Sequence, residues 1–305
     1  TDGNIYLTGV TYSSDFPTTT GAYDVSHSLN DPDVFVSKLN GDLTSLLAST
    51  YLSGSSGGFG SSMAIDSAGK VYGTGYTKSS DFPTTTGVYD SSRSGSYDVF
   101  VSKLNGDLTS LLASTYLGGS SVESSRSIVL DPNRNVYVTG NTDSSDFTIT
   151  TGAYDTSFNS NYDDDNGGYT SDVFVSKLNE DLTSLLASTY LGGSSSDSSN
   201  FIAIDSGENI YVAGLTWSSN FPTTTGAYDT SHNDIFVSKI NSDLTSLLAS
   251  TYLGGSDSDY IESITISSSG NVYVVGRTDS SDFPATIGAY DNSYNGGSYD
   301  VFVSN

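Results

Sequence analysis

The chain of 305 residues carries 35 acidic residues against 10 lysines and arginines, so its net charge is −25 at pH 7. A surface of this charge repels the phosphates of nucleic acids and anionic membranes, and we expect neither as a partner. The sequence contains no cysteine, which excludes a disulfide framework, and no apolar stretch long enough for a membrane span.

Four strand-like phrases, named A to D, recur in order along the chain. The chain opens with B, C and D over residues 4–52 and closes with A, B and C over residues 261–305, with three complete units between them. Val, Ile, Tyr, Phe and Thr dominate the phrases, and Gly, Asn, Asp and Ser separate them, as strands and turns require. In the second unit we expect strand A at 62–66, B at 70–77, C at 98–105 and D at 111–117.

The C phrase, Asp-Val-Phe-Val-Ser or Asp-Ile-Phe-Val-Ser, sets the repeat length. It begins at Asp33, Asp98, Asp172, Asp234 and Asp300, with spacings from 62 residues (Asp172 to Asp234) to 74 residues (Asp98 to Asp172). Such a long repeat made only of strands predicts a β-propeller, and a β-solenoid is second because its coils are shorter. The consecutive apolar residues of the phrase fit a strand covered on both faces.

We therefore predict an all-β chain, a β-propeller of four-stranded antiparallel blades whose first and last repeat units are incomplete. It forms a single propeller domain or a segment of one over residues 1–305. The approximate units are residues 1–56, 57–121, 122–195, 196–257 and 258–305.

Several motifs resemble one known family in the same order in every unit. In the second unit they are Ile-Asp-Ser-Ala-Gly-Lys-Val-Tyr from Ile65, Ser-Asp-Phe-Pro from Ser80, the C phrase from Asp98, and Ser-Thr-Tyr-Leu-Gly-Gly from Ser114. They resemble the SBBP family, the beta-propeller repeat, over essentially the whole chain. The resemblance implies propeller blades in a large secreted or surface protein of bacteria or archaea, and it implies no catalytic residues.

The phrases add up to 18 expected strands, which is not a multiple of four. Three interpretations stay open: the chain is part of a longer polypeptide, it is a five-bladed ring with two three-stranded blades, or it leaves open edges for neighbouring subunits. Unpaired strand edges are templates for pairing with another chain. Four lysines share one position in strand C, where we expect structural ion pairs between blades: Lys38, Lys103, Lys177 and Lys239.

The loops between B and C vary most between units. Each opens with a phrase such as Ser-Ser-Asp-Phe-Pro, continues with threonines and ends near Gly-Ala-Tyr-Asp. In an antiparallel blade these loops and the D–A links emerge on one side, so we expect a loop-rich, acidic binding face.

The long third B–C loop contains a candidate calcium site. Asn161, Asp163 and Asp165 stand at positions 1, 3 and 5 of a twelve-residue frame, Gly167 at position 7 and Asp172 at position 12. Alternate oxygen ligands at this spacing can converge on one calcium ion. A solvated acidic turn is the alternative interpretation. A weaker second candidate consists of Asp257, Asp259 and Glu262.

Catalysis is not expected. The two histidines, His27 and His232, stand at a loop position that other units fill with different residues, and we interpret it as exposed and variable. The Gly-x-Ser-x-Gly pattern from Gly54 lies in a linker without a strand–turn–helix context. Paired carboxylates of a lyase or glycosidase are the residual alternative. For the single tryptophan, Trp217, packing at the start of a B–C loop is the first interpretation and a sugar-stacking platform the second.

These observations predict a non-catalytic extracellular structural or adhesive module. We expect it at the cell surface, self-associating through strand edges or neighbouring subunits into a filament-like structure, with no required cofactor. The alternative is a propeller whose acidic B–C loop face binds calcium together with a glycan or a surface protein.

Overall fold

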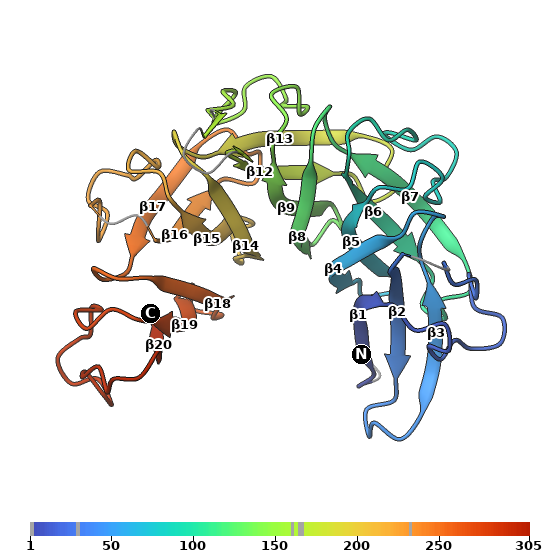
Figure 1. Cartoon of the computed structure of the whole chain (residues 1–305), viewed down its shortest axis with the longest axis horizontal. Coiled ribbons are helices and arrows are strands. Elements are labelled where there is room, and N and C mark those ends of the chain that lie inside the picture. The colour runs from blue at the N-terminus through green and yellow to red at the C-terminus, as the bar shows by residue number, and fades with distance from the viewer. Residues whose placement is uncertain (1–2, 29–30, 160–161, 164–167, 232–233) are drawn as a thin grey trace. The chain divides into compact units, whose positions relative to one another are not determined.

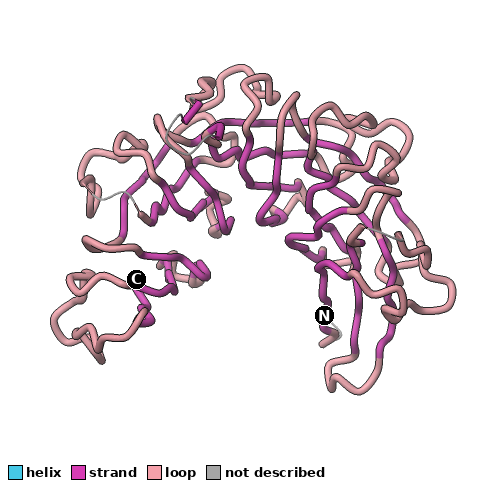
Figure 2. Tube along the Cα trace, viewed as in Figure 1, coloured by secondary structure: helices cyan, strands magenta, loops and turns pink. Residues whose placement is uncertain are grey.

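The computed structural model describes residues 3–28, 31–159, 162–163, 168–231 and 234–305. Within these residues the chain forms twenty strands and no helix, and loops connect the strands throughout (Figure 2). Eighteen of the strands form five sheets (Figure 1). The first sheet contains β1 (Ile5–Thr11), β2 (Asp33–Leu39) and β3 (Leu46–Tyr51). The second contains β4 (Gly58–Ile65), β5 (Val71–Thr77), β6 (Asp98–Leu104) and β7 (Leu111–Leu117).

The other three sheets repeat this plan. The third contains β8 (Glu123–Leu130), β9 (Val136–Thr142), β12 (Asp172–Leu178) and β13 (Leu185–Leu191). The fourth contains β14 (Asp197–Ile204), β15 (Ile210–Thr216), β16 (Ile235–Ile240) and β17 (Leu247–Leu253). The fifth contains β18 (Asp259–Ile266), β19 (Val272–Thr278) and β20 (Asp300–Ser304). A two-strand hairpin of β10 (Tyr162–Asp163) and β11 (Gly168–Tyr169), which the sequence did not predict, lies in the long third loop.

Each complete sheet keeps its strands in the chain order A, B, C, D with antiparallel neighbours. The first sheet has no A strand and the fifth has no D strand among the described residues. The prediction of an all-β fold with propeller-type antiparallel repeats is confirmed, with three or four strands in each sheet.

The described residues pack as two compact units. One is formed by Thr1–Val138, Ser144–Thr148 and Ser176–Leu186, and the other by Thr139–Asp143, Ile149–Val175 and Ala187–Asn305. The third sheet contributes residues to both. The single domain expected from the repeats stays a prediction.

The C strands are buried on both faces, as their apolar sequence indicates. In β6, Val99, Phe100 and Val101 are all fully buried. Their burial joins neighbouring sheets within a unit, because Val34 of the first sheet and Phe100 of the second belong to one core cluster with Leu108. The hydrophobic effect of this burial stabilises the packing of one repeat on the next.

Glycine in strand B lets a bulged strand A approach closely. The register of β4 shifts between Gly60 and Ser62 opposite β5. A methyl group on Gly75 of β5 would lie 2.0 Å from the carbonyl oxygen of Phe59, so no side chain fits there. Gly276 of β19 repeats the arrangement, because a methyl group there would lie 2.1 Å from the carbonyl oxygen of Tyr260.

The turn between C and D has one geometry in four sheets. In the second sheet the side-chain oxygen of Asn105 accepts hydrogen bonds from the backbone N–H groups of Thr109 and Ser110 at 2.9 and 3.0 Å. This Asn cap forces the leucine inside the turn into the left-handed region, where φ lies between 54° and 58°. The four leucines are Leu43, Leu108, Leu182 and Leu244.

The B–C loops follow a course that the sequence did not reveal. After leaving strand B, each loop of the first four sheets runs along the outer edge of strand D. In the second sheet Thr85 N–H donates to the carbonyl of Ser114 at 3.1 Å, and Tyr116 N–H donates to the carbonyl of Asp90 at 2.9 Å. The loop therefore covers the D edge that would otherwise be open to pairing, instead of standing free at one face.

Candidate functional site

Most of the predicted calcium loop lies outside the described residues. Asn161, Asp165 and Gly167 belong to that part, and the backbone of Asp163 lies in β10. Asp172 is the first residue of β12 and is fully buried. The twelve-residue loop as a whole stays a prediction, and the described part of it leads to Asp172.

The second predicted cluster does not come together. Asp259 is buried and accepts hydrogen bonds from Gly255 N–H at 2.6 Å and Ser280 Oγ at 3.1 Å. Asp257 is exposed, and Glu262 forms an ion pair with Arg277 at 3.3 Å. Within the described ranges no group of three or more acids or histidines is arranged to hold a metal ion.

Asp172 instead faces a second buried carboxylate. Asp197 is the first residue of β14 and is fully buried. Gly192 lies between them, and a methyl group on this glycine would stand 2.6 Å from Asp172 Oδ1 and 3.0 Å from Asp197 Oδ2. The two carboxyl groups thus meet beside Gly192, where any larger residue would clash with both of them. We call them the Asp172–Asp197 pair.

Hydrogen bonds hold one oxygen of each carboxyl group and leave the other without a partner. Asp172 Oδ2 accepts from Asn159 N–H at 2.8 Å, and Asp197 Oδ2 accepts from Gly193 N–H at 2.7 Å and Ser218 Oγ at 2.9 Å. Both Oδ1 atoms are buried and have no hydrogen-bond partner among the described residues. An unpaired buried polar atom is costly, so the arrangement calls for a compensating group.

The electrostatics of the pair follow from this burial. Desolvation, with a smaller contribution from the nearby charge of Asp197, raises the pKa of Asp172 to about 7, although the hydrogen bond from Asn159 opposes the rise. Desolvation also raises the pKa of Asp197 to about 6, although hydrogen bonds from Thr216, Gly193 and Ser218 favour its charged form. The pair is therefore a site where negative charge is poorly compensated by the protein.

Similar pairs recur at the same place in other sheets. Asp98 and Glu123 are both fully buried, and a methyl group on Gly118 would lie 2.9 Å from Asp98 Oδ2 and 3.0 Å from Glu123 Oε2. In the first sheet the C-strand acid is Asp33, but Gly58 stands where the A-strand acid would be. The first three sheets thus share a buried acid at the start of strand C, whereas Asp234 and Asp300 are only partly buried, and the acidic partner is not constant.

The loop position before each C-strand acid differs in charge between sheets. His27 Nδ1 lies 2.7 Å from Asp33 Oδ2, and its side chain is only 12% exposed. The position varies between sheets as expected, but its interpretation as exposed is wrong for His27, because the loop folds back over the acid. His232 lies outside the described residues.

In the second and third sheets the same position holds an arginine and a phenylalanine. Arg93 acts on Asp98: desolvation raises the pKa of Asp98, while backbone hydrogen bonds and the charge of Arg93 oppose the rise. Phe158 packs on Tyr190 with ring centroids 5.7 Å apart, as the His27 ring packs on Tyr51 at 5.9 Å. The Asp172–Asp197 pair thus has an apolar ring where the other two sites have a basic side chain.

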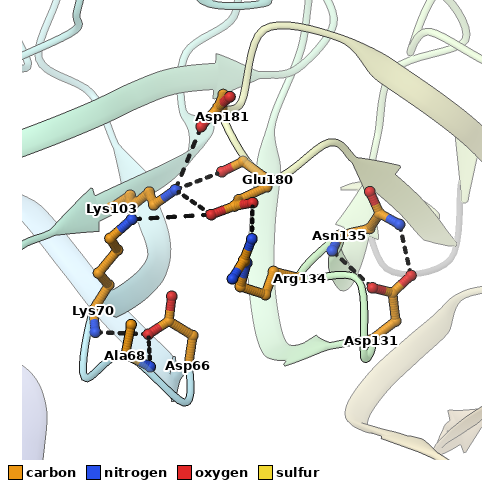
Figure 3. A network of polar contacts seen from close by, with 9 residues as sticks. All are labelled: Asp66, Ala68, Lys70, Lys103, Asp131, Arg134, Asn135, Glu180 and Asp181. Carbon is orange, nitrogen blue, oxygen red and sulfur yellow. Dashed lines mark hydrogen bonds and ion pairs between the residues drawn. The ribbon is translucent and has the colours of Figure 1, made fainter.

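A separate ion network surrounds Glu180, in the turn between β12 and β13 (Figure 3). Its carboxylate lies 2.8 Å from Arg134 Nη2, 3.3 Å from Lys103 Nζ and 4.0 Å from Lys70 Nζ. Burial disfavours the charged form of Glu180, but hydrogen bonds from Arg134 and Lys103 outweigh it and lower its pKa. Asp181 lies 3.5 Å from Lys103 on the other side.

The C-strand lysines show that this network is structural. Lys103 of the second sheet bonds to the turn of the third, as the prediction of ion pairs between repeats requires. Lys177 and Lys239 instead pair with Asp131 at 3.8 Å and Asp205 at 3.0 Å, inside their own sheets. Each of the four lysines also lies over a strand-B tyrosine ring, at 4.9 to 5.3 Å from the centroid.

Two further sequence candidates are placed by the structure. Trp217 is 55% exposed, so packing accounts for less than half of its surface. The Gly-x-Ser-x-Gly segment is tied to the next B–C loop, because Ser55 N–H donates to Asp81 Oδ1 at 2.9 Å and Ser56 N–H to Ser79 Oγ at 2.8 Å. These serines have a structural role in the link between two sheets.

A groove of about 720 Å³ runs along β20 and its B–C loop. Its lining includes Phe283, Thr286, Asp291 and Phe302. The two phenylalanine rings stack at 4.3 Å, and the corresponding rings of the first, second and fourth sheets lie 4.4 to 4.5 Å apart. In those sheets a tyrosine of strand D completes the cluster, and in the fifth sheet no D strand is described.

Repeated antiparallel sheets with these shared turns, loops and buried acids define a propeller-type repeat protein. The model of the SBBP family, a beta-propeller repeat, matches residues 49–83, 114–148, 188–222 and 250–284. Each match runs from a D strand through the next A and B strands to the start of a B–C loop. The chain therefore belongs to the proteins built from SBBP repeats.

Two solved structures are similar to the chain. A protein of unknown function from Bacteroides caccae aligns with a TM-score of 0.45 and 13% identity, over 79% of this chain and 61% of that one. BamB from Moraxella catarrhalis aligns with a TM-score of 0.25 and 8% identity, over 81% of this chain and 78% of its own. The chain thus spans 61% of the length of the Bacteroides protein.

No curated protein matches the chain. Among the described residues, no helix has the length and apolar character needed to cross a membrane.

Proposed function

We propose that the chain is a non-catalytic, self-assembling structural or adhesive module at the outer surface of the cell. We further propose that the edge of β20 accepts a strand with the sequence of the D strands, which a neighbouring subunit or a further part of the same polypeptide supplies. The observation that carries this proposal is the groove along β20. It holds the parts that bind strand D in the other sheets, and no described strand fills it.

The exposed side chains of β20 support this proposal. Val301 and Val303 are 79% and 69% exposed, whereas Val99 and Val101 at the same positions of β6 are fully buried. Because strand side chains stand on the faces of a sheet, these exposed apolar residues favour the packing of a further sheet on the fifth one. Backbone hydrogen bonds along the edge would supply the affinity, and side-chain pockets the specificity.

The chemistry of the incoming strand follows from the strands that fill this place elsewhere. The D strands β7, β13 and β17 share the sequence Leu-Leu-Ala-Ser-Thr-Tyr-Leu. In the second sheet Thr115 Oγ1 accepts from Asp90 N–H at 2.8 Å, and Tyr116 Oη donates to the carbonyl of Ser79 at 2.7 Å. Asp291 and Ser280 occupy the positions of Asp90 and Ser79 in the fifth sheet. We therefore expect the Thr and Tyr of an incoming strand to determine which strand binds there.

The buried position of the carboxyl pairs supports a non-catalytic role. Asp172 and Asp197 are fully buried, so a polysaccharide could not reach them without local opening of the sheet. Glycoside hydrolysis needs two carboxyl groups on either side of an accessible glycosidic bond.

The experiment uses a fluorescent peptide with the sequence of residues 246–254, which contains strand β17, and measures its binding by fluorescence polarisation. We expect saturable binding of this peptide, and loss of binding when its Thr and Tyr are replaced by alanine. The assembly state is measured in parallel by electron microscopy and sedimentation, and the peptide should shorten the assemblies because it occupies their growing edge.

Two results would contradict the proposal. One is a chain that remains a monodisperse monomer at high concentration. The other is a set of assemblies whose length the peptide does not change, because growth would then use another surface.

A further inference from the structure

The Asp172–Asp197 pair differs from the equivalent acids in the balance of charge. Among the described residues Asp33 has the basic neighbour His27, and Gly58 stands where a second acid would be. The Asp98–Glu123 pair has Arg93 nearby, and its charge acts on Asp98.

At Asp172 and Asp197, two buried acids meet Phe158 in the place of the basic side chain. Burial of two carboxyl groups without a positive partner is unfavourable unless another species neutralises them. The first two junctions have a basic side chain at this loop position, and this junction does not.

The polar contacts of the pair leave a defined place for that charge. Both Oδ2 atoms are held by N–H or O–H donors, which fixes the two carboxyl groups in position. Both Oδ1 atoms are buried without a hydrogen-bond partner among the described residues, and the oxygens that lie beside Gly192 are Asp172 Oδ1 and Asp197 Oδ2. Fixed carboxyl groups with free oxygens are a preorganised cation ligand set.

We propose that the Asp172–Asp197 pair binds a hard divalent cation, calcium, and that this ion replaces the basic side chain of the other junctions. Oxygen ligands suit calcium, which takes six to eight of them, and carbonyl groups or waters would supply those that the two carboxylates do not. A divalent charge would neutralise both acids. This site shares Asp172 with the predicted calcium loop but needs neither Asp163 nor Asp165.

The inference does not depend on the proposed assembly function, because the pair and the β20 edge lie in different sheets. Calcium affinity would be in the range of extracellular modules, with a Kd on the order of 10⁻⁴–10⁻³ M.

Trp217 provides a direct readout. It is the only tryptophan of the chain, and it precedes Ser218, whose hydroxyl donates to Asp197. Its backbone N–H also bonds to the carbonyl of Ser196 at 3.0 Å. Terbium, which substitutes for calcium and emits light when a nearby tryptophan is excited, should therefore report binding at this pair.

The test exchanges the distinguishing residue between two junctions. In the full chain, Phe158→Arg places a guanidinium where the second junction has Arg93, and Asp197→Asn removes one ligand. In the unmodified chain we expect terbium luminescence and calcium binding by calorimetry. In both variants the affinity for calcium should be at least tenfold weaker. Calcium should raise the melting temperature of the unmodified chain only. In chelator, Phe158→Arg should melt no lower than the unmodified chain, which separates loss of the site from loss of the fold.

A double variant of the loop, Asp163→Asn with Asp165→Asn, distinguishes the pair from the predicted calcium loop. Calcium binding at unchanged affinity in this variant supports the pair. Binding that is lost in the loop variant and retained in Phe158→Arg overturns the proposal. A chain without terbium or calcium binding also overturns it, because protons would then neutralise the two acids.

Discussion

The leucines of the C–D turns provide a matched test of how burial and backbone strain oppose each other. Leu43 and Leu244 occupy the same turn position, with φ of 58° and 56°. They differ in burial, because Leu43 is 63% exposed and Leu244 is fully buried. Replacement of each by glycine removes the same backbone strain but very different amounts of packing.

The expected free energies of unfolding follow from three contributions. Glycine relieves a left-handed strain of about 1–2 kcal/mol. Its greater freedom in the unfolded chain costs about 0.5–1 kcal/mol. Truncation of a buried leucine costs about 3–5 kcal/mol, whereas truncation of an exposed one costs little. We therefore expect Leu244→Gly to lower the free energy of unfolding by about 2–4 kcal/mol, and Leu43→Gly to leave it unchanged or raise it by about 1 kcal/mol.

Urea denaturation measures both variants. For Leu244→Gly the fluorescence of Trp217 reports unfolding of the same sheet, and for Leu43→Gly far-ultraviolet circular dichroism follows the strands of both compact units. The linear extrapolation is applied to each transition separately, since two compact units need not unfold together. Equal destabilisation by the two substitutions would refute the reasoning, because it would mean that the turn needs a leucine side chain whatever its burial.

Two further predictions concern the ion network and the strand-B glycines. Glu180→Gln should lower stability by about 1 kcal/mol at pH 7, after allowance for solvent screening, because Lys103 loses its closest carboxylate. The pKa of Glu180 is lower in the folded than in the unfolded chain, so its contribution to stability is present above the unfolded pKa and is lost as pH falls through the folded pKa. The melting curves of the two proteins should therefore converge in acid. A difference in melting temperature that stays constant with pH would contradict the assignment. Gly75→Ala should destabilise the second sheet by about 1–3 kcal/mol through its clash with Phe59, whereas Gly73→Ala in the same strand, with nothing within 4 Å, should change stability by less than about 0.5 kcal/mol in thermal melts. A similar loss in both glycine variants would place the cause in the strand backbone and not in the clash.

The sequence predicted the strands well where a phrase carries a clear apolar pattern. Strand D was expected at residues 111–117 and β7 occupies Leu111–Leu117, and strand C was expected at 98–105 and β6 occupies Asp98–Leu104. Strand A was expected to start at residue 62, but β4 starts at Gly58. Its first residues are glycines and Phe59, which look like a linker, and their backbone pairs with β5 across the bulge at Gly60.

The course of the B–C loops could not be read from the sequence. The loops bind strand D through backbone groups, such as the N–H of Thr85 and the carbonyl of Ser114, and backbone contacts leave little trace in residue choice. For the same reason His27 was interpreted as exposed. Its contact with Asp33 exists only because the loop turns back over the start of strand C.

The candidate site was half visible in the sequence. Asp172 was selected for its place in a calcium-like spacing, but Asp197 lies 25 residues away and was not connected with it. A signal was present, because an acid stands four residues after the second glycine of each Gly-Gly link, at Glu123, Asp197 and Asp259. Recurrence at one repeat position indicated a shared role, and only the fold shows that the role is to face the C-strand acid across a glycine.

The B–C loops also join consecutive sheets. Each of the first three loops donates a backbone hydrogen bond of 2.8 to 2.9 Å to the C–D turn of the following sheet. The donor and acceptor residues are Tyr23 with Leu108, Tyr89 with Leu182, and Tyr154 with Leu244. Because a hydrogen bond stabilises both of its partners, loss of an inner sheet under mechanical force removes one such bond from the sheet before it and one from the sheet after it. In a protein whose repeats depend on their neighbours, local damage would therefore spread to both sides of the damaged sheet.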